Sequence, residues 1–185
     1  MKASRRELMR QASVLVASWA LTRCKPAEVT TPPAPDASAP KPPPPTAPGK
    51  AFLPPQRATL DATVARILPT DEEPGAKEAN VIEYIDREVA RPEYEWLKKN
   101  LVAGTVGLDK NANRLYQKPF IKLGPAEQDE VIGQVQAGSE RGADFIKILV
   151  LLTLEGFVGD PAYGGNQGNV GWTFVGYGPG IHEHH

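Results

Sequence analysis

The chain has 185 residues, 19 of them proline and only one cysteine, and its formal net charge at pH 7 is −1. Residues 1–55 hold 8 of the 21 basic and 3 of the 22 acidic side chains, so residues 56–185 hold 13 and 19 and are net acidic. A single cysteine excludes an intramolecular disulfide and any multi-cysteine zinc, iron–sulfur or haem c site, and the acidic balance disfavours binding to nucleic acid or anionic membrane.

Residues 1–24 show, in the right order, the features of a twin-arginine export signal. Arg5 and Arg6 are followed two residues later by an apolar residue and then by a basic one, and a weakly apolar run occupies residues 12–21. That run is too short to cross a hydrocarbon layer of roughly 30 Å. We therefore predict export to the periplasm by this route, with an ordinary amphipathic helix carrying a chance Arg-Arg pair as the alternative.

Two processing sites fit this segment. Cleavage after Ala20 would place the small residues Ser18 and Ala20 before the cut. Alternatively, residues 21–24 (Leu-Thr-Arg-Cys) imitate a lipobox and would leave Cys24 as a lipidated N-terminus, although Arg23 stands where a small residue is usual. A lipidated Cys24 would hold the protein on a membrane without spanning it.

Residues 25–55 are predicted to be a disordered, proline-rich tether. The stretch from Pro26 to Pro55 contains 12 of the 19 prolines and almost no large apolar residue. Such a segment buries too little surface to offset the entropy of ordering it, and it favours local polyproline II structure. A spacer is the favoured interpretation, and a ligand for proline-binding modules is the alternative.

Residues 56–185 are predicted to form an all-α domain, an irregular bundle of about five to six helices with a loop region rich in glycine and aromatic residues at its C-terminal end. Pro74, Pro92 and Pro125 are placed to open helices, and Gly138 to close one. Residues 143–154 are apolar on most sides, which predicts a central core helix. The stretches with helical apolar spacing are Leu60–Leu68, Val81–Val89, Tyr94–Leu101, Leu115–Tyr116, Val131–Val135 and Phe145–Leu154.

Three motifs make the sequence similar to a known family. Residues 67–76 are Ile-Leu-Pro-Thr-Asp-Glu-Glu-Pro-Gly-Ala, residues 160–166 are Asp-Pro-Ala-Tyr-Gly-Gly-Asn, and Trp172 is followed by Gly-Tyr-Gly-Pro-Gly at 176–180. With the twin-arginine leader, they resemble the gluconate 2-dehydrogenase subunit 3 family over residues 57–181. The segment 160–166 is the most specific of the three.

The resemblance implies a role beside a catalytic partner. Members of that family are small subunits that associate with a large glucose-methanol-choline-type flavoprotein, often with a cytochrome c subunit, and are expected to supply its export signal. FAD and haem c are then expected in partner subunits, not in this chain. The twin-arginine route carries folded proteins, which agrees with a partner exported together with its cofactor. The long tether and Cys24 are departures that the family pattern does not require.

No catalytic, cofactor-binding or metal-binding residue is assigned from the sequence. Residues 163–166 lack the Lys and Ser/Thr of a phosphate loop, and Asp71, Glu72 and Glu73 are explained by a helix N-terminus. The histidines His182, His184 and His185 lie in a terminal tail.

Exposed aromatic side chains among glycines are instead typical of interface anchors, although a structural turn that wraps the core is the alternative interpretation. The residues expected to contact a partner are Asp160, Pro161, Tyr163, Gly164, Gly165, Asn166, Trp172 and Tyr177. The chain is thus predicted to be no enzyme by itself but a subunit aiding export and assembly. A free-standing periplasmic lipoprotein with an all-α binding domain is the second hypothesis.

Overall fold

The computed structural model describes residues 50–177 of the chain. The export signal, Cys24 and nearly all of the tether lie outside the described residues, as does the C-terminal histidine tail. Residues 50–177 form six α-helices and four short 3-10 helices, with no strand among them. The all-α prediction is therefore confirmed.

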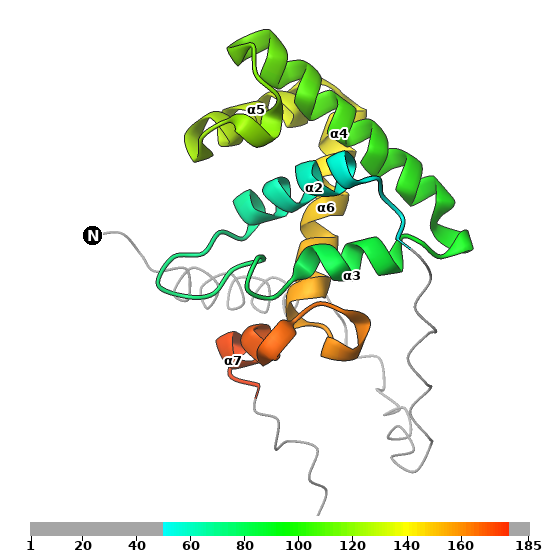
Figure 1. The fold of residues 1–185 in the computed structure, drawn as a ribbon, viewed down its shortest axis with the longest axis vertical. Coiled ribbons are helices and arrows are strands. Elements are labelled where there is room, and N and C mark those ends of the chain that lie inside the picture. Colours follow the sequence, from blue (N-terminus) through cyan, green and yellow to red (C-terminus); the bar gives the residue numbers. More distant parts are fainter. Residues whose placement is uncertain (1–49, 178–185) are drawn as a thin grey trace, which may run out of the picture. The chain divides into compact units, whose positions relative to one another are not determined.

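The central element is α6, which contacts the five other α-helices and runs down the middle of the fold in Figure 1. The α-helices are α2 (Pro54–Ile67), α3 (Val81–Glu88), α4 (Glu95–Tyr116), α5 (Pro125–Gly138), α6 (Glu140–Val158) and α7 (Val170–Val175). The 3-10 helices are η1 (Pro92–Tyr94), η2 (Phe120–Lys122), η3 (Pro161–Tyr163) and η4 (Gln167–Asn169).

The core is a single apolar cluster to which most of the helices contribute. Complete burial of one such side chain is worth about 1.5–3 kcal/mol. The largest fully buried apolar side chains are Phe120, Phe145, Leu60, Ile85, Leu101, Leu108 and Leu149. Most of the stretches with helical apolar spacing in the sequence contribute at least one of these buried side chains.

The α5 helix has the bounds that its sequence predicts. Pro125 is its first residue, and Glu127 Oε2 accepts a hydrogen bond from the backbone N–H of Gly124 at 2.7 Å. Proline suits this position because the first N–H of a helix has no partner within the helix. Gly138 ends α5, and Ser139 then caps α6 by accepting a bond from Gly142 N at 3.1 Å.

The α3 helix begins later than predicted. Pro74 does not open it, because the chain from Gly75 to Asn80 turns back on the end of α2. The backbone N–H of Ala76 donates to the Leu68 carbonyl at 2.8 Å. A Cβ at position 75 would lie only 2.5 Å from that same oxygen, so glycine permits this close return.

The α4 helix is one element of 22 residues, although the sequence predicts two segments there. Glycine weakens a helix interior by about 1 kcal/mol relative to alanine, and Gly104 and Gly107 interrupt the apolar pattern. In the structure, however, Gly104 receives the ring of Phe145, where a Cβ would lie 2.1 Å from a ring carbon. Packing against α6 therefore stabilises the helix across this weak point.

The folded region begins before the boundary expected at Gln56. Ala51 and Phe52 are buried, and Pro54 and Pro55 are the first two residues of α2. Gln56 Oε1 accepts a hydrogen bond from Leu53 N at 3.0 Å, which stabilises this start. Proline content indicated a tether here, but the same prolines occupy the first turn of a helix, where they are tolerated.

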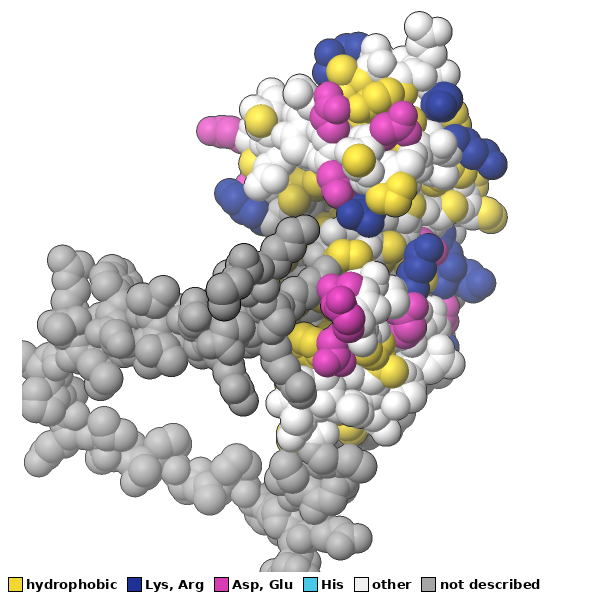
Figure 2. All heavy atoms as spheres, turned by 90° about the vertical axis from the view of Figure 1, so that its left-hand side faces the viewer, with side chains coloured by type: hydrophobic (Ala, Val, Ile, Leu, Met, Phe, Trp, Pro, Cys, Tyr) yellow, Lys and Arg dark blue, Asp and Glu magenta, His cyan; other side chains and the backbone are white. Residues whose placement is uncertain are grey.

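Hydrophobic side chains and charges of both signs are interspersed on the face of the molecule that Figure 2 shows. Acidic side chains gather beside apolar ones in the lower half of that view. No helix within residues 50–177 combines the length and the apolar character that crossing a membrane requires.

Candidate functional site

Asn166 joins the end of α6 to the start of α7. Its side chain is fully buried, with Nδ2 donating to the Gly159 carbonyl at 2.8 Å and Oδ1 accepting from Gly171 N at 2.8 Å. Its backbone N–H donates to the Gly156 carbonyl at 2.8 Å. One buried side chain thus supplies partners for polar backbone groups that would otherwise be unsatisfied.

The neighbouring glycines permit unusually close backbone approaches. A Cβ at Gly165 would lie 2.2 Å from the Gly156 carbonyl oxygen, and one at Gly171 would lie 1.7 Å from that of Phe157. Gly164 has a φ of 102°, a backbone conformation that favours glycine. The structural-turn interpretation therefore accounts for Gly164, Gly165 and Asn166.

The loop does not form a phosphate cradle, because its backbone donors are used within the fold. Ala162 N donates to Asp160 Oδ1 at 2.9 Å, and Gly164 N donates to the Pro161 carbonyl at 3.0 Å. The N–H of Asn166 is also occupied, as described above. A phosphate site needs several free N–H groups converging on one point.

The aromatic residues of this region divide between the inside and the outside. Phe174 packs edge-on against Phe157 with ring centroids 5.8 Å apart. Trp172 and Tyr177 remain partly exposed and contact each other edge-on at 5.2 Å. The indole N–H of Trp172 donates to the Val158 carbonyl at 2.7 Å, which fixes the ring against the end of α6.

The helix α6 is central, as its apolar run predicts, but one of its sides is exposed. Leu151, Leu154 and Val158 are 57%, 40% and 40% exposed. They lie on the same helical side as the exposed Lys147 and Glu155, which the sequence spacing already places together. These two charged residues indicated in the sequence which side of the helix is exposed. The continuous apolar run between them instead suggested that all sides were covered.

We call the exposed apolar side chains of α6 and α7, together with the partly exposed Trp172, the α6–α7 surface. It comprises Leu151, Leu154, Val158, Trp172 and Val175, of which Val175 is 55% exposed. The bond from Trp172 to Val158 makes the part on α6 continuous with the part on α7. Contiguous exposed apolar side chains of this kind mark interaction sites.

Of the eight residues predicted to contact a partner, Trp172 lies within the α6–α7 surface and Tyr177 lies against Trp172. Asp160, Pro161 and Tyr163 are partly exposed in and beside η3. The remaining three make the internal connections already described. Four members of the α6–α7 surface, all aliphatic, were absent from the sequence prediction.

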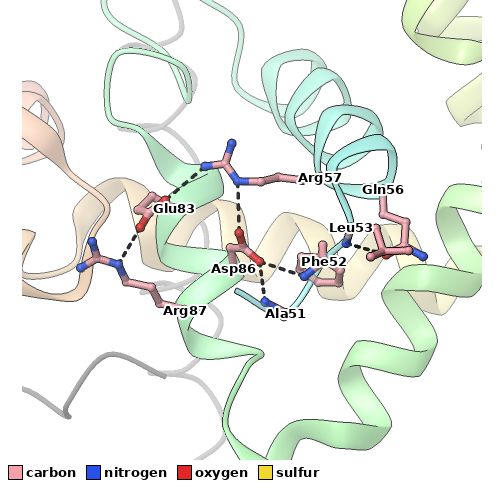
Figure 3. A network of polar contacts seen from close by, with 8 residues as sticks. All are labelled: Ala51, Phe52, Leu53, Gln56, Arg57, Glu83, Asp86 and Arg87. Carbon is pink, nitrogen blue, oxygen red and sulfur yellow. Dashed lines mark hydrogen bonds and ion pairs between the residues drawn. The ribbon is translucent and has the colours of Figure 1, made fainter. Parts of the chain in front are cut away.

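A buried carboxylate holds the N-terminal end of the folded region (Figure 3). Asp86 on α3 is fully buried, and its Oδ1 accepts from the backbone N–H groups of Ala51 at 2.8 Å and Phe52 at 3.1 Å. Its Oδ2 accepts from Arg57 Nε at 3.1 Å. We call these four residues the Asp86 cluster.

Glu83 lies beside the Asp86 cluster and bridges two arginines. Its carboxylate accepts from Arg87 Nε at 2.7 Å and from Arg57 Nη2 at 3.2 Å. Partial burial is the largest single influence and opposes ionisation, but the hydrogen bond and charge of Arg87, with the charges of Arg57 and Lys50, outweigh it. The pKa of Glu83 therefore lies below its usual value.

Glu83→Gln is expected to lower the free energy of unfolding at pH 7 by about 0.5–1 kcal/mol, because the side chain is only partly buried. A depressed pKa in the folded state means that this stabilisation is present above the unfolded value of about 4.3 and is lost as the pH falls through the folded pKa. Urea unfolding of both proteins between pH 7 and pH 3 would measure it. A difference that stays constant over this range would contradict the assignment, and Glu95→Gln is the exposed control.

No three His, Cys, Asp or Glu side chains among residues 50–177 are grouped closely enough to hold a metal ion. The arrangement of the α6–α7 surface is instead suited to contact: apolar side chains on a central helix, with an aromatic ring fixed at one end.

The comparisons with known proteins agree with the motifs. The family model described as "Gluconate 2-dehydrogenase subunit 3" matches residues 54–180. No curated protein and no solved structure matches the chain.

Proposed function

The chain belongs to the gluconate 2-dehydrogenase subunit 3 family, and from this premise we propose that it is the non-catalytic small subunit of a periplasmic, membrane-associated, FAD-dependent dehydrogenase. Its large partner is a flavoprotein of the glucose-methanol-choline type, and a cytochrome c subunit is a further partner. FAD and haem c belong to those subunits. Arg5 and Arg6 direct export of the assembled pair, and Cys24 or Ala20 marks the processing site.

The exposure of the α6–α7 surface carries this proposal. Three of its aliphatic side chains belong to α6, and Trp172 lies against the end of that helix. Because α6 contacts all the other α-helices, the surface is held rigidly. Buried aromatic anchors surrounded by aliphatic contacts supply most of the free energy of protein association. The surface therefore suits docking of the large subunit.

Leu154→Glu and Trp172→Ala are each expected to weaken association with the flavoprotein at least tenfold, which corresponds to about 1.4 kcal/mol. The tagged chain is purified at native expression, and the bound flavin per chain is measured by its absorbance. Val106→Glu is the matched control, because Val106 is 63% exposed on α4 and lies outside the α6–α7 surface. Equal flavin recovery from all three variants would overturn the assignment of the surface.

A further variant tests the export part of the proposal. Replacing Arg5 and Arg6 together with lysine should leave both the chain and the flavoprotein in the cytoplasm, because twin-arginine export requires the arginine pair. The measurement is the distribution of flavoprotein between cytoplasm and periplasm. A flavoprotein that still reaches the periplasm without this signal would exclude the escort role.

A further inference from the structure

A concave region lies between α4, α5 and the beginning of α6, and these helices pack together at one end of the fold in Figure 1. Its volume is about 670 Å³, within the range of sites that bind small molecules. It is separate from the α6–α7 surface. Residues 141–145 of α6 contribute to its lining, whereas the α6–α7 surface begins at Leu151. We call it the α4–α6 cleft.

The lining of the α4–α6 cleft is basic, although the domain as a whole is acidic. Lys99, Lys110, Arg114 and Arg141 all line it, and no Asp or Glu does. Clefts lined by charges of one sign concentrate the electrostatic field and attract ligands of the opposite sign. The cleft therefore offers a local environment for anions that the net charge of the domain does not suggest.

The positive charges of the cleft are largely uncompensated. Within residues 50–177, no carboxylate forms an ion pair with Lys110, Arg114 or Arg141. Lys99 lies 3.8 Å from Glu95, and both side chains are mostly exposed, so this pair is weak. The guanidinium of Arg114 is also oriented, because its Nη2 donates to Asn111 Oδ1 at 3.1 Å.

The wall of the cleft also contains an unpaired polar atom and open space. Oδ1 of Asn100 is buried without a hydrogen-bond partner, and Asn100 lines the cleft. A buried acceptor without a partner costs free energy, and this atom is not reached from the cleft because it has almost no accessible surface. A Cβ at Gly107 or Gly138 would meet no atom within 4 Å, so the glycines leave this wall free.

We propose that the α4–α6 cleft binds a small polyanion, a molecule with two or more carboxylate or phosphate groups. Arg114 and Arg141 hold the anionic groups, because a planar guanidinium forms bidentate pairs with carboxylate and with phosphate. Lys99 and Lys110 supply further positive charge in the lining. The inference is independent of the role proposed for the α6–α7 surface.

Calorimetric titration of the purified full chain tests this proposal, with citrate and inorganic pyrophosphate as probes at two salt concentrations. Citrate presents carboxylate groups and pyrophosphate presents phosphate groups. At least one probe is expected to bind with a Kd below about 1 mM, more weakly at higher salt. The double variant Arg114→Gln/Arg141→Gln should bind at least tenfold more weakly. Lys118→Gln/Lys122→Gln removes the same charge from outside the cleft and should bind as the wild type does.

A second variant tests the cleft without changing its charge. Gly107→Met places a side chain in open space on a helix, so the fold is retained, which the melting temperature verifies, and binding should be lost. Absence of binding by the wild-type chain at saturating probe would overturn the proposal, as would binding that neither variant reduces. Binding by the free chain that disappears in the purified flavoprotein complex would also overturn it, because a partner segment would then occupy the cleft.

Discussion

Asp86→Ala is expected to lower the free energy of unfolding of the full chain by about 3 kcal/mol, a large part of the stability of an ordinary domain. The substitution removes three hydrogen bonds at once. It leaves the buried N–H groups of Ala51 and Phe52 without an acceptor and Arg57 without one of its carboxylate partners. Arg57 is 29% exposed and keeps its contact with Glu83, which limits the loss.

Urea unfolding followed by circular dichroism would measure this effect. Asp144→Ala is the matched control, since Asp144 is 60% exposed and lies 3.6 Å from Lys147, and it should change the free energy of unfolding by less than about 0.5 kcal/mol. Asp86→Asn should fall between the two, because an amide oxygen still accepts from the backbone while the charge is gone. Equal stability of the two alanine variants would show that the Asp86 cluster contributes little.

Gly171→Ala is expected to cost about 2–3 kcal/mol and to weaken the attachment of α7. The added methyl group would lie 1.7 Å from the Phe157 carbonyl oxygen, which belongs to the backbone of α6 and cannot rotate away. To accommodate it, α7 must move and the bond from Gly171 N to Asn166 must lengthen or break. Faster hydrogen exchange at the amides of α7 would report this movement directly.

Gly133→Ala provides the matched control for the same chemical change. Position 133 is an exposed helical site on α5, and a Cβ there meets no atom within 4 Å. Alanine should therefore stabilise the chain by about 0.5–1 kcal/mol through its better helix propensity. If both substitutions stabilised the protein, the close approach of α6 and α7 would be disproved.

The sequence predicted helix ends correctly where those ends depend on the residues at the ends themselves. The α5 helix follows the rule of proline at the start and glycine at the end, and its bounds are correct. The start of α3 depends on the bond from Ala76 to Leu68 at the end of α2, and the continuity of α4 depends on packing against the distant Phe145. Propensity alone could not supply these contacts, because the glycines that weaken a helix also permit them.

The candidate site was predictable only in part for a similar reason. Trp172 and Tyr177 were found because aromatic residues among glycines are conspicuous. The exposed side of α6 was missed because Leu151, Leu154 and Val158 belong to an uninterrupted apolar run, in which only neighbouring helices decide which side is covered. A buried carboxylate such as Asp86 has no local signature either, since its backbone partners lie 34 and 35 residues earlier.

The Asp86 cluster holds the entering chain through the main-chain amides of positions 51 and 52, and the side chains of Ala51 and Phe52 are buried in the apolar core. A different leader or spacer joined in front of Ala51 would therefore leave both the hydrogen bonds and this burial in place. The helical domain can accordingly be moved into fusion proteins as a unit that begins at Ala51.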